Sequence, residues 1–114
     1  MNHNLSYISL LNNISELISD ACKLIIKQNN LDYNYKIDGS PVTKADIEAD
    51  KLIFGRLRKL TPHIPIISEE RSLDNDNLKN DLHWIIDPLD GTQSYIKGKD
   101  EYTVNIALIE NKLA

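Results

Sequence analysis

Residues 84–92, which read WIIDPLDGT, decide the fold and the chemistry that the sequence predicts. The apolar residues that open this stretch are typical of a buried strand, which we expect Asp87 and Pro88 to break. Proline fixes its own backbone angle and Gly91 allows angles that strain other residues, so a tight turn is expected next. The stretch therefore predicts a strand that delivers two carboxylates, Asp87 and Asp90, onto a turn.

The two carboxylates of this turn point to a magnesium site. Oxygen ligands suit Mg²⁺, and the carbonyl of Leu89, between the two acids, can turn outward as a further ligand. We expect Thr92 to cap a short helix, whose first N–H groups would face a phosphate. Asp87 to Gly91 is equally a good β-turn, and from these residues alone both interpretations stay open.

A second pair of acids follows another apolar run. Residues 64–68 are typical of a short buried strand that delivers Glu69 and Glu70 at its end. Because ligands in open sheets gather beyond the carboxyl ends of strands, these acids could reach the same ion as Asp87. Their alternative interpretation is a solvated loop, continuous with the polar and mobile loop expected over residues 71–81.

Two amphipathic helices are expected from the spacing of apolar residues. The first covers residues 5–27, with apolar residues every three or four positions at Ile8, Leu11, Ile14, Leu17, Ile18, Ala21, Cys22 and Ile25. The second covers residues 43–60 and ends at Thr61-Pro62, with one face formed by Ala45, Ala49, Leu52, Ile53, Leu57 and Leu60.

Short strands are expected over residues 31–38 and 101–110, where apolar and polar residues alternate, with a turn at residues 39–41. Helices first and strands later, with single helices between them, indicate a layered α/β or α+β sheet. The chain stops directly after the last strand, and unpaired strand edges promote association. We therefore expect self-association or poor solubility.

Thr43 and Asp46 form the pair that a hydrolytic water needs, a hydroxyl and a carboxylate able to orient and deprotonate it. The same four residues, 43–46, resemble a helix capping box in which aspartate replaces the usual glutamate. The structural role and the chemical role can coexist.

Composition excludes several classes of protein. The chain has 114 residues, a net charge of −4 and 41% hydrophobic residues, as an ordinary globular domain does. The negative net charge argues against a protein that binds nucleic acid through a broad basic face. A single cysteine, Cys22, excludes an internal disulfide, and no apolar run is long enough to span a membrane. A cytoplasmic protein is expected.

The residues collected so far resemble the inositol monophosphatase superfamily. The resemblance rests on residues 68–70 and 87–92, and residues 39–46 and 102–109 are most similar to its bacterial 3′(2′),5′-bisphosphate nucleotidases. It implies the layered α/β/α/β/α sugar-phosphatase fold. It also implies Mg²⁺-dependent removal of the 3′-phosphate from 3′-phosphoadenosine 5′-phosphate, which yields AMP in sulfur assimilation. The implied location is the cytoplasm, including the cytoplasmic face of the inner membrane.

The resemblance also assigns roles to individual residues. It implies that Glu69, Asp87 and the Leu89 carbonyl hold a first ion, and that Asp87 and Asp90 hold a second ion. The catalytic set that it implies, which orients and activates the attacking water, is Asp46, Thr92 and Glu69. The substrate contacts that it implies are Glu69, Leu89, Asp90, Gly91, Thr92 and Lys36.

Two departures from the family pattern bear on function. Gln93 stands where the nucleotidases carry a lysine, which removes a charge beside the phosphate. Family members are about twice as long, and their second half supplies a Trp-Asp segment that completes the second metal site. Residues 1–114 are therefore expected to be the N-terminal half of the phosphatase domain, with the C-terminal half, the lid and much of the nucleoside pocket absent.

Three hypotheses follow from this pattern. The first is a bisphosphate nucleotidase, acting on a small nucleotide. The second is a non-catalytic remnant, or one half of a split enzyme that a separate chain completes. The third is an inositol monophosphatase or another sugar phosphatase, which shares the site and differs in substrate.

Overall fold

The computed structural model describes residues 3–28, 33–35, 39, 41–68, 82–99 and 101–110. The elements along the chain are α1 (His3–Lys27), β1 (Tyr33–Tyr35), β2 (Pro41–Thr43), α2 (Lys44–Leu60), β3 (Ile66–Ser68), β4 (Leu82–Asp90), α3 (Thr92–Ile96) and β5 (Thr103–Glu110). Both predicted long helices are confirmed. The loop expected over residues 71–81, and most of the strand expected over residues 31–38, lie outside the described residues.

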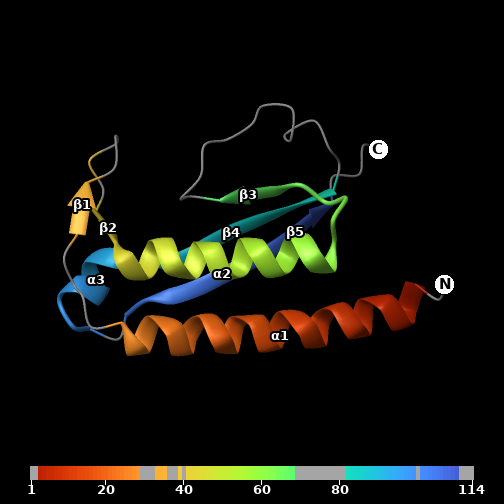
Figure 1. Cartoon of the computed structure of the whole chain (residues 1–114), viewed down its shortest axis with the longest axis horizontal. Helices are drawn as coiled ribbons and strands as arrows, with labels where there is room; N and C mark the ends of the chain where they lie inside the picture. The colour runs from red at the N-terminus through yellow and green to blue at the C-terminus, as the bar shows by residue number, and fades with distance from the viewer. Residues whose placement is uncertain are drawn as a thin grey trace.

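The strands form two small sheets. β3, β4 and β5 lie side by side in that order, with β3 parallel and β5 antiparallel to β4, while β1 and β2 form an antiparallel pair. The helices α1 and α2 run in opposite directions and pack together on one side of the three-stranded sheet (Figure 1). This is the mixed helix-and-sheet layering that the sequence predicts.

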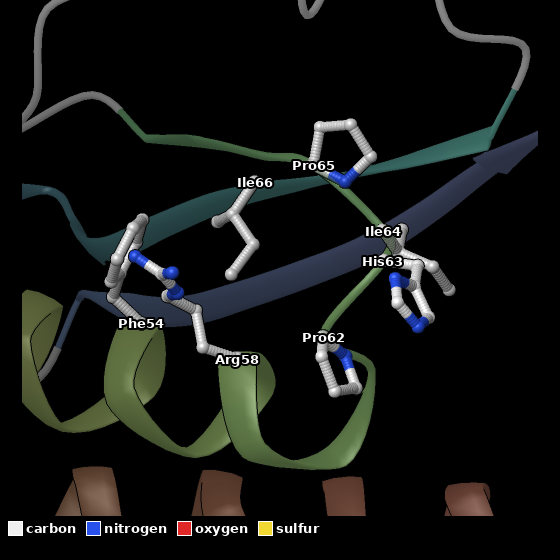
Figure 2. Close-up of a pocket in the computed structure, with 7 residues that line it drawn as sticks. All are labelled: Phe54, Arg58, Pro62, His63, Ile64, Pro65 and Ile66. Atoms are coloured by element: carbon white, nitrogen blue, oxygen red, sulfur yellow. The ribbon is translucent and has the colours of Figure 1, made fainter.

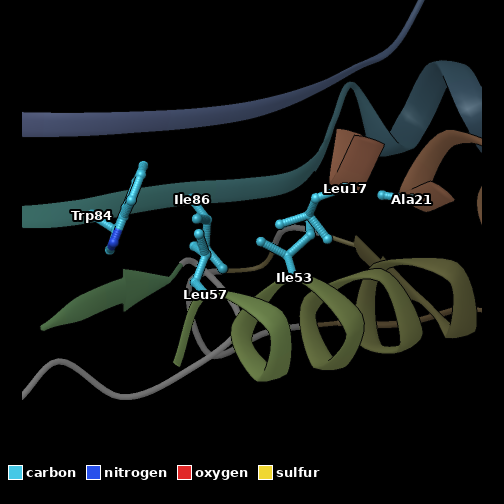
Figure 3. Close-up of a cluster of buried hydrophobic side chains, with 6 residues drawn as sticks. All are labelled: Leu17, Ala21, Ile53, Leu57, Trp84 and Ile86. Carbon is cyan, nitrogen blue, oxygen red and sulfur yellow. The ribbon is translucent and has the colours of Figure 1, made fainter. Parts of the chain in front are cut away.

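A buried apolar cluster joins the two helices to β4 (Figure 3). Its members, none more than 3% exposed, are Leu17, Ala21, Ile53, Leu57, Trp84 and Ile86. Full burial of one large apolar side chain contributes roughly 1.5–3 kcal/mol, so this cluster is the main cohesive element. The Trp84 indole also donates a hydrogen bond of 2.9 Å to the hydroxyl of Thr61, just beyond the end of α2.

A second buried cluster joins α1 and α2 to the end of β4 and to α3. It consists of Ile25, Ala45, Ala49, Leu89 and Tyr95. The Tyr95 hydroxyl lies 3.0 Å from the carbonyl oxygen of Ile25 and 3.1 Å from that of Gln28, and it donates to them. The short helix α3 is thereby fastened to the end of α1.

The expectation that Asp87 and Pro88 break the strand is wrong, because β4 continues to Asp90. Asp87 pairs with Asn105 and Asp90 pairs with Thr103, so β4 accommodates one extra residue in this interval. Such a bulge frees the backbone from regular pairing, and a proline, which has no N–H to donate, fits there. The described pairing with β3 also ends before Pro88, at Ile86.

Part of each predicted apolar helix face is also exposed. Ile8 and Leu11 are 60% and 67% exposed, because the buried side of α1 follows Leu17, Ala21 and Ile25. At the end of α2, Leu60 is 36% exposed. Among the described helices, none has the length and apolar character needed to cross a membrane.

Candidate active site

The first turn of α2 carries the capping box that the sequence predicts. Thr43 has an extended backbone, and its hydroxyl accepts a 3.3 Å hydrogen bond from the backbone N–H of Asp46. In return, Asp46 Oδ2 accepts from the Thr43 backbone N–H at 2.7 Å and from the Thr43 hydroxyl at 2.6 Å. The carboxylate of Asp46 is therefore held in one orientation, at 0% exposure.

Thr92 lies against the other oxygen of this carboxylate. Its hydroxyl donates to Asp46 Oδ1 at 2.9 Å and lies 3.3 Å from the carbonyl oxygen of Leu89. The expectation that Thr92 caps α3 is wrong: the cap position is Gly91, and no side chain caps this helix. The Thr92 hydroxyl is turned toward Asp46 instead, where a charged acceptor makes the stronger hydrogen bond.

The turn between β4 and α3 depends on Gly91. Its φ of 98° lies in the left-handed region, and a Cβ built there would lie 2.6 Å from the carbonyl oxygen of Glu101. Only glycine fits both constraints without displacing the backbone. Gly91 thus sets the position of Thr92 relative to Asp46.

Asp87 and Asp90, which the sequence predicts on a turn, both lie within β4 and differ in exposure. Asp87 is half-buried, whereas Asp90 is exposed and accepts a 3.3 Å hydrogen bond from the side-chain amide of Asn105. Leu89, between them, is 3% exposed and anchors the turn in the second buried cluster. The end of β4 is therefore anchored in the interior by an apolar side chain, while its two acids lie at or near the surface.

Two further polar residues that the sequence analysis missed lie beside this site. Asp50, one helical turn after Asp46, accepts a hydrogen bond from the hydroxyl of Ser68 at the end of β3. Both side chains are 3% exposed. The signal in the sequence was an acid on the predicted buried face of the helix, because Asp50 lies four residues from Asp46 and adjacent to Ala49.

Tyr95 of α3, in the second buried cluster, has a shifted pKa. Burial, the neighbouring Tyr102 and the negative charge of Asp46 raise the pKa of Tyr95 above its ordinary value. The rings of Tyr95 and Tyr102 meet edge to face, with centroids 5.3 Å apart. Tyr95 therefore stays protonated at neutral pH and serves as a hydrogen-bond donor to α1.

The oxygen donors of the site match the ligand chemistry of Mg²⁺, which takes carboxylate and carbonyl oxygens. Within the residues that the structure describes, no three acids, histidines or cysteines come close enough to hold a metal ion. The acids Glu69 and Glu70, and also Lys36, lie outside these residues. Of the predicted metal ligands, the described chain thus contains Asp87, Leu89 and Asp90.

A cavity of about 250 Å³ lies at the C-terminal end of α2, whereas Asp46 lies at its N-terminal end (Figure 2). Its walls include Phe54 and Arg58, whose guanidinium carbon lies 5.7 Å from the centroid of the Phe54 ring. Phe54 and Arg58 follow Asp46 by 8 and 12 residues, about 12 and 18 Å along the helix axis, so this cavity is separate from the first turn of α2. None of the predicted site residues that the structure describes lines it.

Comparison with known proteins gives a family. The inositol monophosphatase family matches residues 5–114. A protein of Buchnera aphidicola named 3′(2′),5′-bisphosphate nucleotidase CysQ is 40% identical over 106 residues, which are 89% of this chain and 40% of the relative. The CysQ of Salmonella typhimurium is 49% identical over 81 residues, which are 70% of this chain and 33% of that protein. The chain thus spans two fifths or less of these relatives.

Solved structures agree with this assignment. A structure of CysQ from Bacteroides thetaiotaomicron superposes with a TM-score of 0.72 at 34% identity, covering 90% of this chain and 38% of the other. An IMPase of Thermotoga maritima superposes with a TM-score of 0.77 at 31% identity, covering 90% and 40%. The fold is therefore that of these proteins, over about two fifths of their length.

Proposed function

The chain belongs to the inositol monophosphatase family, and we propose that it provides the water-activating and first metal-binding part of a Mg²⁺-dependent 3′(2′),5′-bisphosphate nucleotidase. The observation that carries this proposal is the hydrogen bond from the Thr92 hydroxyl to Asp46 Oδ1, which joins a hydroxyl to a buried carboxylate. A cytoplasmic location belongs to the same proposal.

The proposed chemistry is hydrolysis by an oriented water. The Thr92 hydroxyl donates a hydrogen bond to Asp46, so the lone pairs of its oxygen are available to accept a hydrogen bond from water. Asp46 is held by Thr43 and by Thr92, so it cannot turn away when the water binds. The pair orients the water toward phosphorus, and the proton of the water passes through the Thr92 hydroxyl to Asp46.

The acids beside this pair would hold the metal. We assign Asp87, the Leu89 carbonyl and Glu69 to a first ion, and Asp87 and Asp90 to a second. Bound Mg²⁺ supplies positive charge that offsets the charge of the phosphate. Gly91 and Thr92, at the start of α3, contribute backbone N–H groups that have no partner inside the helix and can contact phosphate oxygens. Lys36 and Glu69 complete the proposed phosphate contacts.

We assign the remaining parts of the site to the portion of the CysQ relatives that this chain does not cover. They would supply the last ligand of the second ion and much of the nucleoside pocket, in the same chain or in a separate one. Residues 1–114 are accordingly proposed as the N-terminal part of one phosphatase domain.

A nucleotide is favoured over an inositol phosphate as substrate. The relatives at 40–49% identity are named bisphosphate nucleotidases. The IMPase structures of similar shape share 31% identity or less with this chain. Substrate preference follows the closer sequences more often than it follows the fold, which hosts several activities.

Phosphate release tests the proposal. The 114-residue chain is mixed with the separately produced remaining part of the Buchnera relative, and 3′-phosphoadenosine 5′-phosphate or inositol 1-phosphate is added with Mg²⁺ or with EDTA. We expect Mg²⁺-dependent release from the nucleotide at a higher rate than from inositol 1-phosphate. The chain alone is the control for self-sufficient activity.

The other outcomes of this assay are equally informative. Faster release from inositol 1-phosphate would identify a sugar phosphatase. No release from either substrate, with a complex formed, would identify a remnant that has kept the fold and lost the activity.

A further inference from the structure

Asp50 and Ser68 lie at the junction of three elements that meet beside the proposed metal site. Asp50 belongs to α2, and it accepts the hydrogen bond of Ser68 at the end of β3. Ser68 pairs with Ile86 of β4, and the next residue of β4 is the proposed metal ligand Asp87. One side-chain contact therefore fixes α2, β3 and β4 together, one residue away from Asp87.

Burial makes this contact costly to disrupt. Asp50 and Ser68 are each 3% exposed, so water cannot replace the hydrogen bond if either partner is removed. Losing a hydrogen bond costs a buried carboxylate more free energy than it costs an exposed one, because water replaces the lost bond only at the surface. Asp50 therefore constrains where β3 ends more strongly than a surface contact would.

Asp50 also completes a pattern on α2. Asp46 and Asp50 lie four residues apart, on the same side of the helix. Asp46 binds Thr92 at the start of α3, and Asp50 binds Ser68 at the end of β3. The two sides of the proposed site are thus attached to two successive turns of a single helix.

We propose that Asp50, acting through Ser68, is a positioning residue that holds the end of β3 against the part of β4 next to Asp87, in the geometry that Mg²⁺ binding requires. The inference rests on the proposed function, because it assigns the metal to the Asp87 side of the site. Residues that hydrogen-bond behind metal ligands set the orientation of the ligands, and replacing them commonly weakens metal binding about 10- to 100-fold.

Mg²⁺ binding to the 114-residue chain, measured by isothermal titration calorimetry, tests this role without any substrate. Ser68→Ala removes the hydroxyl and keeps the charge of Asp50, so any loss of affinity reflects positioning and not electrostatics. We expect the dissociation constant for Mg²⁺ to rise about 10-fold or more. Ser68→Thr keeps a hydroxyl and should restore most of the affinity.

Two surface variants serve as matched controls. Ser19→Ala, which removes an exposed hydroxyl from α1, is the control for Ser68→Ala. Glu48→Gln, which removes one negative charge from the surface of α2, is the control for Asp50→Asn at the buried position. Both should leave Mg²⁺ affinity within about twofold of the parent. Asp50→Asn combined with Ser68→Ala should weaken binding no more than Asp50→Asn alone, because the two residues act as one unit.

Amide hydrogen exchange without metal provides the second readout. In Ser68→Ala, exchange at Ile67 and Asp87 should accelerate relative to exchange in the middle of α2. If Ser68→Ala binds Mg²⁺ as tightly as the parent, the positioning role is wrong while the proposed function stands. If the parent itself binds no Mg²⁺ at millimolar concentration, the proposed metal site fails, and the positioning role fails with it.

Discussion

The hydroxyl of Thr92 donates a 2.9 Å hydrogen bond to Asp46 Oδ1, although the two residues are 46 positions apart in the sequence. Asp46 is fixed by the capping box of α2, and Thr92 is fixed by the left-handed Gly91 that precedes it. A helix cap and a glycine turn, each explained by local backbone chemistry, thus meet to form a hydroxyl–carboxylate pair.

Removing the Thr92 hydroxyl should abolish most of the activity of the completed enzyme. Thr92→Val keeps the shape of the side chain and cannot pass a proton to Asp46, so we expect phosphate release to fall by about 10²- to 10⁴-fold. Thr92→Ser keeps the hydroxyl and should stay within about tenfold of the parent. Steady-state phosphate release measures both, with circular dichroism as the check on folding. A Thr92→Val variant with parental activity would exclude the proposed proton path.

Removing the cap of α2 should destabilise the fold. Thr43→Ala eliminates the hydroxyl that accepts from the Asp46 N–H and donates to Asp46 Oδ2, so the free energy of unfolding should fall by about 1–2 kcal/mol. Thr43→Ser keeps both hydrogen bonds and should lose less than half of that. Urea unfolding followed by the fluorescence of Trp84, the single tryptophan and 3% exposed, gives the values. Equal losses in the two variants would mean that the hydroxyl contributes nothing.

The local features of this site could be predicted from sequence because their signals are local. The capping box over residues 43–46 needs only four consecutive residues, and the periodicity of α2 needs only one helix. The acids Asp87 and Asp90 also follow from a short motif, but the turn predicted to carry them is wrong, because both lie in β4. The helix and its cap were accordingly expected, and the structure contains both.

The non-local features could not be predicted. Whether β4 continues past Pro88 depends on its pairing with β5, where one extra residue is accommodated before Asp90. Which part of the apolar face of α1 is buried depends on where α2 and the sheet lie, so the periodicity that includes Ile8 could not show that Ile8 is exposed. The contact between Asp50 and Ser68 joins residues 18 positions apart on different elements, and a single sequence carries no signal for that pairing.

Replacing Gly91 or Gly55 with alanine should have opposite effects on the free energy of unfolding. Gly91→Ala places a Cβ 2.6 Å from a backbone oxygen at a left-handed φ of 98°, so stability should fall by about 2 kcal/mol or more. Gly55→Ala, within α2, meets no heavy atom within 4 Å and should raise stability by up to ~1 kcal/mol, because alanine favours helix. The same urea measurement compares them. A Gly91→Ala variant as stable as the parent would show that the turn tolerates another backbone conformation.

The phenol of Tyr95 should make stability fall at alkaline pH. Its pKa is raised in the folded protein, chiefly by burial and then by Tyr102 and the charge of Asp46. Above the ordinary tyrosine pKa, the unfolded chain therefore releases this proton before the folded chain does. The folded state then binds more protons than the unfolded state, so the free energy of unfolding decreases as pH rises. Below that pKa the contribution is fully present.

Tyr95→Phe separates this contribution from the hydrogen bonds of the hydroxyl. At pH 8 the variant should be about 1 kcal/mol less stable than the parent, because the carbonyl groups of Ile25 and Gln28 lose the hydrogen bond from the Tyr95 hydroxyl. At pH 11 the difference should be smaller, because the variant has no phenol to ionise at this position. Tyr35→Phe, at a side chain 68% exposed, is the control and should change stability at pH 8 by less than about 0.5 kcal/mol. An equal difference between Tyr95→Phe and the parent at both pH values would show that the ionisation of Tyr95 is not linked to folding.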